Sequence, residues 1–564
     1  MAQTILPFDS TAKVGSRMPE TLRALLPQGL QQACAQCSYL SDYVQQIPIG
    51  VIGVPAFYPK LTRNLADLPE RNLIYPIKEN LYVHIFPDPA GARDHYISIE
   101  PTTVCNIDDL MPQIDSRLVA WAEDIGRTED KEEKKAFILQ LIERICTAEP
   151  MPTTTKPKPG MMYLTQQQLN AVNYRVLRDK IGLGVLQPLL LDPYIEDISC
   201  SGVGHIFIEH KIFSSVQSSI MFATLDEVDD FAVWLGEWVK SPVTVRNPLV
   251  DAVLPDGSRI NIVYGREISK RGSNFTIRRF SGTPTSVMEL IEYGTLDYMM
   301  AAYLSLMLEE GMNLFVVGAT ASGKTTTLNA ITTFILPDAK IVTIEDTPEV
   351  YVPQKNWVQE TTRQNNASHK GGEVGMFELL KAALRQRPDR IIVGEIRAIE
   401  AVVAFQAMQT GHGVMSTFHA ASVEKLIQRL TGDPISIPKT YIDNLNLAVI
   451  QAAVRLQDGR SARRILSINE IIGYDPPSDT FSYLEAFRWN PNDDRFEFPG
   501  YMNSYLLEEV IAIKRGISPL RRKEIYTELK RRARIFEKLR REKGILDFDT
   551  FFQVLAEARR QKLI

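Results

Sequence analysis

The sequence predicts an α/β protein whose main domain has a mostly parallel sheet. Three observations lead to this prediction. From Asn313 onward, short apolar runs of strand type alternate with helical patterns. The first run ends at Val317 and is followed by a glycine-bearing loop and a helix pattern from Thr325 to Leu336. Two later runs end in the carboxylates Glu345 and Glu395. Alternation of this kind is typical of parallel strands that are covered by helices on both faces.

The other parts of the chain are predicted from breaks in the pattern. A smaller α+β domain and an N-terminal α+β region precede the main domain, and a helical segment follows it. Four prolines between Pro150 and Gly160 exclude a helix or a central strand there, and Ser281–Pro284 marks a second break. The predicted divisions are 1–150 as the N-terminal α+β region with a mobile tail, 151–162 as a linker, 163–283 as the α+β subdomain, 284–490 as the main domain and 491–564 as the helical segment.

The strands of the main domain follow from short apolar runs bounded by turn signals. The mostly parallel set is expected at Asn313 to Val317, Lys340 to Glu345, Trp357 to Thr361, Arg390 to Glu395, Val414 to His419 and Ala448 to Leu456. Two further strands are expected at Arg464 to Tyr474 and Phe481 to Trp489.

Composition narrows the class of protein. The chain has 564 residues, 45% of them hydrophobic, and a net charge of −5, which argues against wholesale nucleic-acid binding. Its five cysteines are scattered, as expected for a reduced protein, and Cys34-x-x-Cys37 has no second such pair, which favours a helix with two small buried thiols over a metal site. No run approaches the roughly 18 apolar residues of a membrane span. Met1 to Gly15 lacks the features of a signal peptide, so we expect a cytoplasmic protein.

A phosphate-binding pattern lies between the first strand and its helix. The pattern G-x-x-x-x-G-K-T is formed by Gly318, Ala319, Thr320, Ala321, Ser322, Gly323, Lys324 and Thr325, and Thr326 follows it. Glycines let successive backbone N–H groups point at an anion, the lysine reaches the β- and γ-phosphates, and the threonine offers its hydroxyl to Mg²⁺. The alternative is a loop that joins a strand and a helix without a ligand. The complete pattern in this context favours the phosphate cradle.

Carboxylates and histidines follow three later strands. The acidic box from Glu345 to Glu349 comes after one apolar strand, where open α/β sheets place their ligands, although Asp346 could also build a turn. Glu395 ends a second strand. Burial of a carboxylate after four apolar residues costs free energy unless a cation or a hydrogen-bond donor lies beside it. His412 and His419 flank a third strand. Taken alone, each histidine is more typical of a structural hydrogen-bond donor. Together with the acidic box and the Glu395 strand, a functional role is favoured.

These four motifs in this order resemble the secretion ATPase superfamily, the hexameric motors of type II secretion, type IV pili and type IV secretion. The likeness covers about Tyr163 to Phe552 and is greatest to the archaeal branch, which drives archaellum rotation and pilus assembly. It implies a RecA-like P-loop domain. Ala398 stands where the bacterial signature has Asp, and the tetracysteine insert of many bacterial relatives is absent. Both departures point away from the bacterial type II branch.

The resemblance also implies roles for single residues. Gly318 to Thr326 would bind ATP, with Lys324 on the phosphates. Glu345 would be the base that orients the attacking water, and Glu395, Thr325 and Asp346 would hold Mg²⁺. His419 would sense the γ-phosphate. The smaller domain would bring Arg259 and Arg278 over the nucleotide.

The function that the resemblance implies is an ATP-hydrolysing motor, hexameric as in this family, that works at the cytoplasmic face of a membrane. It would drive a pilus-like, archaellum or type II secretion filament by pushing on a polytopic membrane platform protein. One alternative is a conjugation-type nucleic-acid or protein translocation ATPase, but the motor domain shows no basic cluster for nucleic acid. The other is a catalytically silent ring, which would not need Lys324, Thr325, Glu345 and Glu395 together.

A basic surface is predicted near the C-terminus. Residues 514–562 hold 16 Lys and Arg against 7 Asp and Glu. The apolar stripe from Ile525 to Leu539 should face inward, which places Lys530, Arg531, Arg532 and Arg534 on the outer face. Two interpretations stay open: an ordinary solvated face, or a dock for acidic loops of the platform protein or for anionic lipid.

Overall fold

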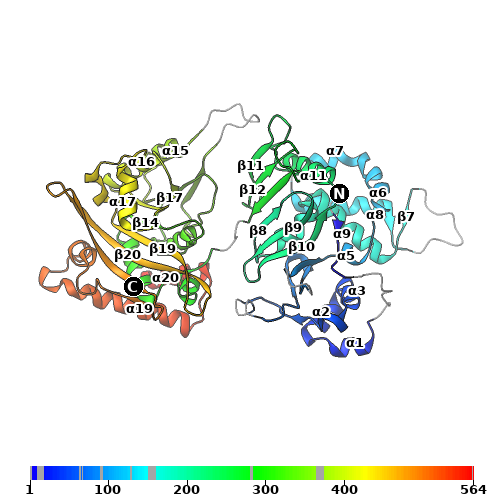
Figure 1. Cartoon of the computed structure of the whole chain (residues 1–564), viewed down its shortest axis with the longest axis horizontal. Helices are drawn as coiled ribbons and strands as arrows, with labels where there is room; N and C mark the ends of the chain where they lie inside the picture. The colour runs from blue at the N-terminus through cyan, green and yellow to red at the C-terminus, as the bar shows by residue number, and fades with distance from the viewer. Residues whose placement is uncertain are drawn as a thin grey trace. The chain divides into compact units, whose positions relative to one another are not determined.

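The computed structural model describes residues 3–8, 18–62, 65, 68–88, 93–127, 130–149, 160–279, 284–363, 374–561 and 563. The chain forms two compact units, Met1–Ser281 and Gly282–Ile564 (Figure 1). Most of the predicted linker at 151–162 lies outside the described residues, as does the predicted joint at Ser281–Pro284 apart from Pro284. The five-part division therefore stays a prediction.

Unit 1 is built on one long sheet, in the order β11-β12-β13-β8-β9-β10-β5-β4-β3-β2, with β1 paired to β10. The parallel pairing of β10 with β5 joins strands from the two predicted N-terminal parts. Its strands are β1 (Gln3–Thr4), β2 (Ala56–Phe57), β3 (Leu73–Pro76), β4 (Tyr82–Phe86), β5 (His95–Ile99), β8 (Ile195–Cys200), β9 (Gly204–His210), β10 (Ser214–Phe222), β11 (Leu249–Val253), β12 (Arg259–Val263) and β13 (Asn274–Arg278); β6 (Cys146–Thr147) and β7 (Met162–Tyr163) form a separate pair.

The helices of unit 1 are α1 (Glu20–Leu25), α2 (Gln28–Gln36), α3 (Ser38–Gln46), α4 (Ile49–Ile52), α5 (Pro101–Val104), α6 (Met111–Leu118), α7 (Ala122–Arg127), α8 (Lys131–Ile145), α9 (Gln166–Lys180), α10 (Gln187–Leu191) and α11 (Leu225–Trp238). Apolar side chains of α2, α3 and α11 pack against the long sheet, whereas those of α6, α8 and α9 form a separate core. The predicted pair of thiols lies at a helix junction and not within one helix, because α2 ends at Gln36 and Cys37 is the N-cap residue of α3. Burial raises the pKa of Cys34 and of Cys37, as suits structural thiols.

Unit 2 holds the predicted parallel sheet, in the order β16-β15-β17-β18-β14-β19-β20-β21-β22. The pairings from β16 to β19 are parallel, and those from β19 to β22 are antiparallel, so the α/β prediction with a mostly parallel sheet is confirmed. The strands are β14 (Leu314–Val317), β15 (Ile341–Glu345), β16 (Trp357–Thr361), β17 (Arg390–Ile396), β18 (Gly413–Phe418), β19 (Leu447–Arg455), β20 (Ser461–Asp475), β21 (Thr480–Asn490) and β22 (Arg495–Glu497).

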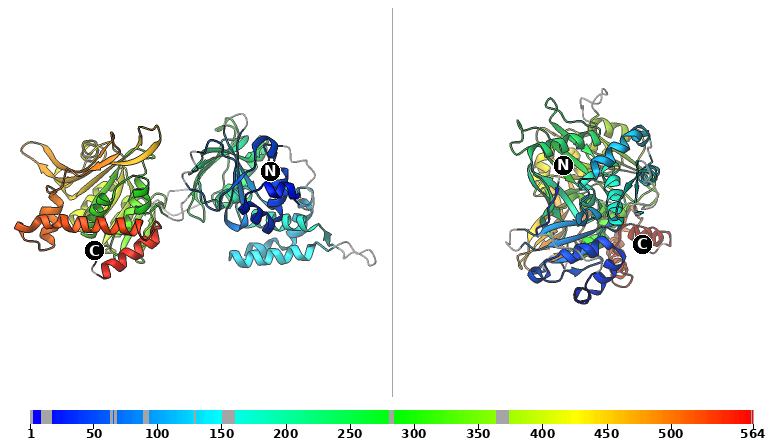
Figure 2. Two further views of the ribbon diagram at one scale, coloured as in Figure 1. Left: turned by 90° about the horizontal axis from the view of Figure 1, so that it is seen from below. Right: turned by 90° about the vertical axis from the view of Figure 1, so that its right-hand side faces the viewer.

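Two hydrophobic cores cover the two faces of this sheet. One contains apolar side chains of α12, α13, α14, α19 and α20, and the other contains those of α15, α16 and α17. Figure 1 shows α16 and α17 away from α19 and α20, and Figure 2 shows the long antiparallel strands, in orange, at one edge of the sheet. The helices are α12 (Val287–Glu292), α13 (Tyr298–Glu309), α14 (Lys324–Ile331), α15 (Met376–Leu384), α16 (Glu400–Gln409), α17 (Val423–Thr431), α18 (Ala512–Lys514), α19 (Ile525–Arg541) and α20 (Phe548–Arg560).

The helix after the phosphate-binding loop is shorter than predicted. It was expected to reach Leu336, but α14 ends at Ile331 and one 3₁₀ turn, Thr332–Phe334, follows. The hydroxyls of Thr332 and Thr333 donate to carbonyls three residues earlier, at 2.7 and 2.8 Å. Such side-chain bonds compete with the helical ladder and tighten the last turn.

The predicted basic face on α19 is wrong at Arg532. This side chain is 1% exposed; its Nη1 donates to Glu309 Oε2 at 2.8 Å and to Ser305 Oγ at 3.0 Å, both on α13. It therefore faces inward with the apolar stripe, because α13 offers a carboxylate there. Lys530, Arg531 and Arg534 remain exposed.

We expect Arg532→Met to lower the free energy of unfolding of the protein by about 3 kcal/mol, because it removes one partner of a buried ion pair. Arg534→Met changes the same charge on the exposed face of the same helix and should cost less than about 0.5 kcal/mol. Chemical denaturation of both variants is the measurement. Equal stabilities for the two would contradict the inward role of Arg532.

Candidate functional site

The phosphate-binding loop lies at the carboxyl end of β14, in the middle of the sheet. Gly323 has a φ of +90° and directly precedes α14, which begins at Lys324. This left-handed conformation suits glycine, and it turns the chain so that the helix N-terminus opens at the loop. Ala321 also has a positive φ, of +60°. The loop is thus a concave run of backbone ahead of a helix N-terminus, as the sequence pattern predicts.

Lys324 lies against the loop that it follows. Its Nζ donates to the carbonyl of Ala319 at 2.9 Å and lies 3.4 Å from His419 Nδ1. Burial lowers the pKa of Lys324, and nearby Glu395 opposes that effect. The ammonium is therefore held at the phosphate-binding loop by a neutral carbonyl. A negatively charged phosphate oxygen would be a stronger hydrogen-bond partner and would replace it.

A chain of alternating polar groups continues from Lys324 across three further strand ends. His419, after β18, has Nε2 2.5 Å from Glu395 Oε1. The other oxygen of Glu395 accepts from Arg397 Nε at 2.7 Å, and Arg397 Nη1 lies 3.8 Å from Asp346 Oδ2, after β15. Burial lowers the pKa of His419, Lys324 adds to this, and Glu395 opposes it. A neutral imidazole with Nε2–H toward Glu395 leaves Nδ1 to accept from Lys324.

Glu345 occupies a separate and drier position. It is 2% exposed, and its Oε1 accepts from the backbone N–H groups of Glu349 at 2.9 Å and Val350 at 2.8 Å. A Cβ on Gly394 would lie 3.0 Å from the Glu345 Cγ, so the glycine leaves room for this carboxyl. Burial raises the pKa of Glu345 to about 8, against the two hydrogen bonds. A carboxyl with a raised pKa is a stronger base once it is deprotonated.

The donor set fits Mg²⁺ together with a nucleotide. Thr325, Asp346 and Glu395 supply one hydroxyl and two carboxylates at this edge, and Mg²⁺ is usually bound by one or two carboxylates, substrate phosphates and water. Within the described ranges, no three His, Cys, Asp or Glu side chains gather closely enough to hold a metal ion by themselves. The metal would therefore need oxygens that the nucleotide brings.

The two predicted arginines lie in unit 1. Arg259 on β12 and Arg278 on β13 stand directly opposite each other, so both point to the same exposed face. Arg259 Nη2 lies 3.6 Å from Asp251, and Arg278 is paired in register with Asp197. Like charges that face each other across two strands are unfavourable, and Asp251 and Asp197 offset this repulsion.

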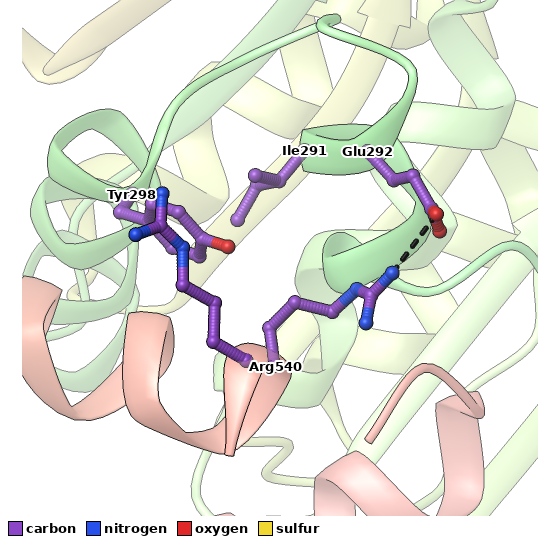
Figure 3. A pocket seen from close by; sticks show the side chains of 5 residues that line it. Ile291, Glu292, Tyr298 and Arg540 are labelled. Carbon is purple, nitrogen blue, oxygen red and sulfur yellow. Dashed lines mark hydrogen bonds and ion pairs between the residues drawn. The ribbon is translucent and has the colours of Figure 1, made fainter. Parts of the chain in front are cut away.

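Other features lie outside the cluster. His412 and His419 lie at opposite ends of β18, and His412 Nδ1 is 3.0 Å from Thr410 Oγ1, away from the loop. A pocket in unit 2 is lined by Ile291, Glu292, Tyr298, Arg540 and Arg541 (Figure 3). Arg540 closes one side of it through an ion pair with Glu292 at 2.9 Å. None of the predicted site residues lines this pocket.

The structure adds three residues that the sequence reasoning did not place in the site. Arg397 bridges Glu395 and Asp346 and could have been found, because it lies two residues after Glu395 and so on the same side of an extended chain. Gln451 and Arg463 donate to carbonyls of the phosphate-binding loop at 3.0 and 3.3 Å. They come from β19 and β20, more than a hundred residues away, and no local pattern marks them.

The comparison with protein families assigns residues 180–491, more than half of the chain, to the type II/IV secretion system protein family. The chain belongs to this family. The resemblance to the secretion ATPase superfamily is therefore confirmed, and with it the P-loop α/β fold class.

Relatives extend the match beyond the family model. The protein MJ0900 of Methanocaldococcus jannaschii is 42% identical over 521 residues, 90% of this chain and 93% of its own. The conjugal transfer protein TrbB of Rhizobium radiobacter is 29% identical and covers 55% of this chain and 94% of its own. The solved structure of the Legionella pneumophila ATPase DotB is 19% identical and covers 68% of this chain and 96% of its own, with a TM-score of 0.39. The family assignment rests on the sequence matches.

We expect Glu345 to make stability fall with rising pH. Its ordinary carboxyl pKa of 4.5 applies in the unfolded chain and a pKa of about 8 in the folded one, so between these values the folded state holds one more proton. The free energy of unfolding should then decrease as pH rises through this window. Glu345→Gln removes the titrating group and should be more stable than wild type at pH 8, by about 2–4 kcal/mol. Urea denaturation at pH 5 and pH 8 measures this, and an unchanged pH slope in the variant would contradict it.

Proposed function

We propose that the protein is an ATP-hydrolysing motor of a type IV pilus-like, archaellum or type II secretion filament machine. The observation that carries the proposal is the chain of contacts from Lys324 through His419 and Glu395 to Arg397 and Asp346. It joins the phosphate-binding loop to carboxylates at the ends of neighbouring strands. Phosphoryl transfer requires such positioned cations and carboxylates, and little covalent chemistry from the protein.

In this proposal the residues divide the work. Gly318 to Thr326 bind the phosphates through backbone N–H groups, and Lys324 leaves the Ala319 carbonyl for them. Bound Mg²⁺, held through Thr325, Glu395 and Asp346, would neutralise phosphate charge. His419 links Lys324 to Glu395, so it is placed to respond when a phosphate draws the lysine away.

Glu345 is proposed as the base that orients water. Its burial keeps a proton on the carboxyl at neutral pH, and two backbone N–H groups fix its orientation. A cationic environment in the loaded site would favour its ionised form. The loaded state would thus create the base, which restricts hydrolysis to the occupied site.

Arg259 and Arg278 are proposed to reach the γ-phosphate when the two units close on the nucleotide. Their exposed position on one face of the sheet supports this role. Closure that delivers a cation couples hydrolysis to movement, which is what a motor requires. We further propose a hexameric ring at the cytoplasmic face of a membrane, where it acts on a polytopic platform protein. None of the described helices is long and apolar enough to cross a membrane.

A second candidate function is translocation of nucleic acid or protein in a conjugation-type system. The likeness to a conjugal transfer protein over 55% of the chain favours it. Both candidates use the same hydrolysis site and differ in what the ring moves. Stimulation of ATP hydrolysis by single-stranded DNA would favour the second candidate, and stimulation by a membrane platform protein would favour the first.

We expect Lys324→Ala to remove nearly all ATP hydrolysis, about 10²-fold or more, because it deletes the cation at the phosphates. Phosphate release at saturating ATP is the measurement. Glu345→Gln is the companion variant: it should bind ATP but not turn it over, since it keeps the shape of the side chain and loses the base.

Two controls make this test decisive. Circular dichroism should show that both variants fold, because the hydrogen-bond partners of the Lys324 ammonium are polar groups of Ala319 and His419, and Glu345→Gln keeps the shape of its side chain. Hydrolysis by Lys324→Ala at the wild-type rate would overturn the proposed function. Loss of ATP binding in Glu345→Gln would instead make Glu345 a binding residue.

Arg278→Ala should slow the chemical step by about 10³-fold and leave ATP affinity nearly unchanged, because the arginine acts only after closure. Arg266→Ala is a matched control: Arg266 is an exposed arginine of unit 1 that is engaged by Asp229 at 3.1 Å. Single-turnover hydrolysis compares the two. If both variants hydrolyse ATP at the wild-type rate, Arg278 has no part in the mechanism.

A further inference from the structure

Gln451 lies behind the phosphate-binding loop, on strand β19 next to β14. The side chain is 2% exposed. Its Nε2 donates to the carbonyl of Ser322 at 3.0 Å, and its Oε1 has no hydrogen-bond partner among the described residues. The ladder between β19 and β20 shifts register between Ile450 and Gln451, so this residue sits at an irregularity in its own strand.

The two glycines of the loop pattern both lie so close to Gln451 that a side chain on either would contact it. A Cβ on Gly318 would come within 2.2 Å of the Gln451 carbonyl oxygen, which only the absence of a side chain permits. A Cβ on Gly323 would lie 3.0 Å from the Gln451 Nε2. Gln451 therefore contacts the loop from both its backbone and its side chain.

The contact with Ser322 has a consequence for the neighbouring peptide group. In a trans peptide the C=O of Ser322 and the N–H of Gly323 point in opposite directions. A donor that holds the Ser322 carbonyl on the outer side therefore aims the Gly323 N–H toward the inner side, where a phosphate would lie. The Gly323 carbonyl is held independently, because it accepts from Thr327 N at 2.9 Å as the first turn of α14.

Arg463 supports the preceding peptide in the same way. Its Nε donates to the Ala321 carbonyl at 3.3 Å, and Ala321 has the unfavourable φ of +60°. Two donors, from β19 and β20, thus hold successive outward carbonyls of a loop whose backbone is not in a relaxed conformation.

We propose that Gln451 is a positioning residue for the nucleotide: it orients the Gly323 amide toward the phosphates. This inference rests on the proposed function. A buried amide whose oxygen has no hydrogen-bond partner lowers the free energy of unfolding relative to an apolar side chain of the same size. In return, the Gln451 amide fixes the orientation of the Ser322 carbonyl. The ligand it serves is a nucleoside di- or triphosphate, since a loop amide would contact the phosphates that ADP and ATP share.

The test compares Gln451→Met with Gln354→Met. Methionine keeps the length of the side chain and packs adaptably, but it cannot donate. Gln354 is a matched control within unit 2: it is 3% exposed, its Nε2 donates to the carbonyls of Thr332 and Ile335 at 3.1 and 3.2 Å, and its Oε1 also has no partner in the described part of the chain. These carbonyls lie just beyond the C-terminal end of α14, at the end remote from the phosphate-binding loop.

Equilibrium titration of the full-length variants with fluorescent ADP and ATP is the measurement. We expect Gln451→Met to weaken both affinities about tenfold, the effect of one lost hydrogen bond at a charged ligand. The turnover number at saturating ATP should stay within about twofold of wild type, so the Michaelis constant carries the change. Gln354→Met should bind both nucleotides as wild type does. Thermal unfolding without nucleotide should show that Gln354→Met and Gln451→Met lose similar amounts of stability.

Unchanged affinity in Gln451→Met, or an equal loss in Gln354→Met, would overturn the proposal. A second variant, Gln451→Glu, keeps the shape and should weaken binding further, because a carboxylate beside the cradle repels phosphate; wild-type affinity in this variant would also overturn it. Wild-type protein and Lys324→Ala belong in the same titration. Absence of nucleotide binding in wild type would end the proposed function and this inference together, whereas normal wild-type binding with an unaffected Gln451→Met ends only the inference.

Discussion

Glu395 is the group on which the arrangement of the candidate site depends. It lies between two nitrogen-bearing neighbours, His419 on one side and Arg397 on the other, and through them it is connected to Lys324 and Asp346. A carboxylate at the end of an apolar strand would be costly without these partners. Because each partner follows a different strand of one parallel sheet, these contacts join the phosphate-binding loop to the acidic box along one edge of the sheet.

The C-terminal helices contact the segment that follows α14, the helix that begins at the phosphate-binding loop. Arg559 on α20 donates to the carbonyls of Phe334 and Ile335 at 2.7 and 3.3 Å, just beyond the helix that begins at the phosphate-binding loop. Its Nε also lies 3.5 Å from Glu309, the carboxylate that pairs with Arg532. The two ion pairs hold the last turn of α13, and the two hydrogen bonds hold the segment just beyond α14. The basic residues of the C-terminal segment therefore serve in part to complete the fold of unit 2, and their number alone does not indicate a binding surface.

The sequence predicts the parallel strands and the loop because both depend on local patterns: apolar runs of strand length, and glycines with a lysine at fixed spacing. It also predicts Glu395 and His419, since the carboxyl ends of parallel strands share one edge. Gln451 and Arg463 escape prediction because they act from strands more than a hundred residues along the chain. Arg532 escapes for a related reason: helical periodicity places an arginine next to a stripe, but only the position of Glu309 on α13 decides which way it faces.

In the proposed mechanism, the contacts of Glu345 would keep the base protonated while the site is empty. Its carboxyl is held by the N–H groups of Glu349 and Val350 and lies next to Gly394. The segment that holds it continues into Tyr351, whose ring packs on Phe548 of α20 with centroids 5.6 Å apart. Movement of this segment would alter the hydrogen bonds of Glu345 and its burial together. Exposure of the carboxyl would lower its pKa, because burial is the main cause of the raised value, whereas loss of the two backbone hydrogen bonds would act in the opposite direction.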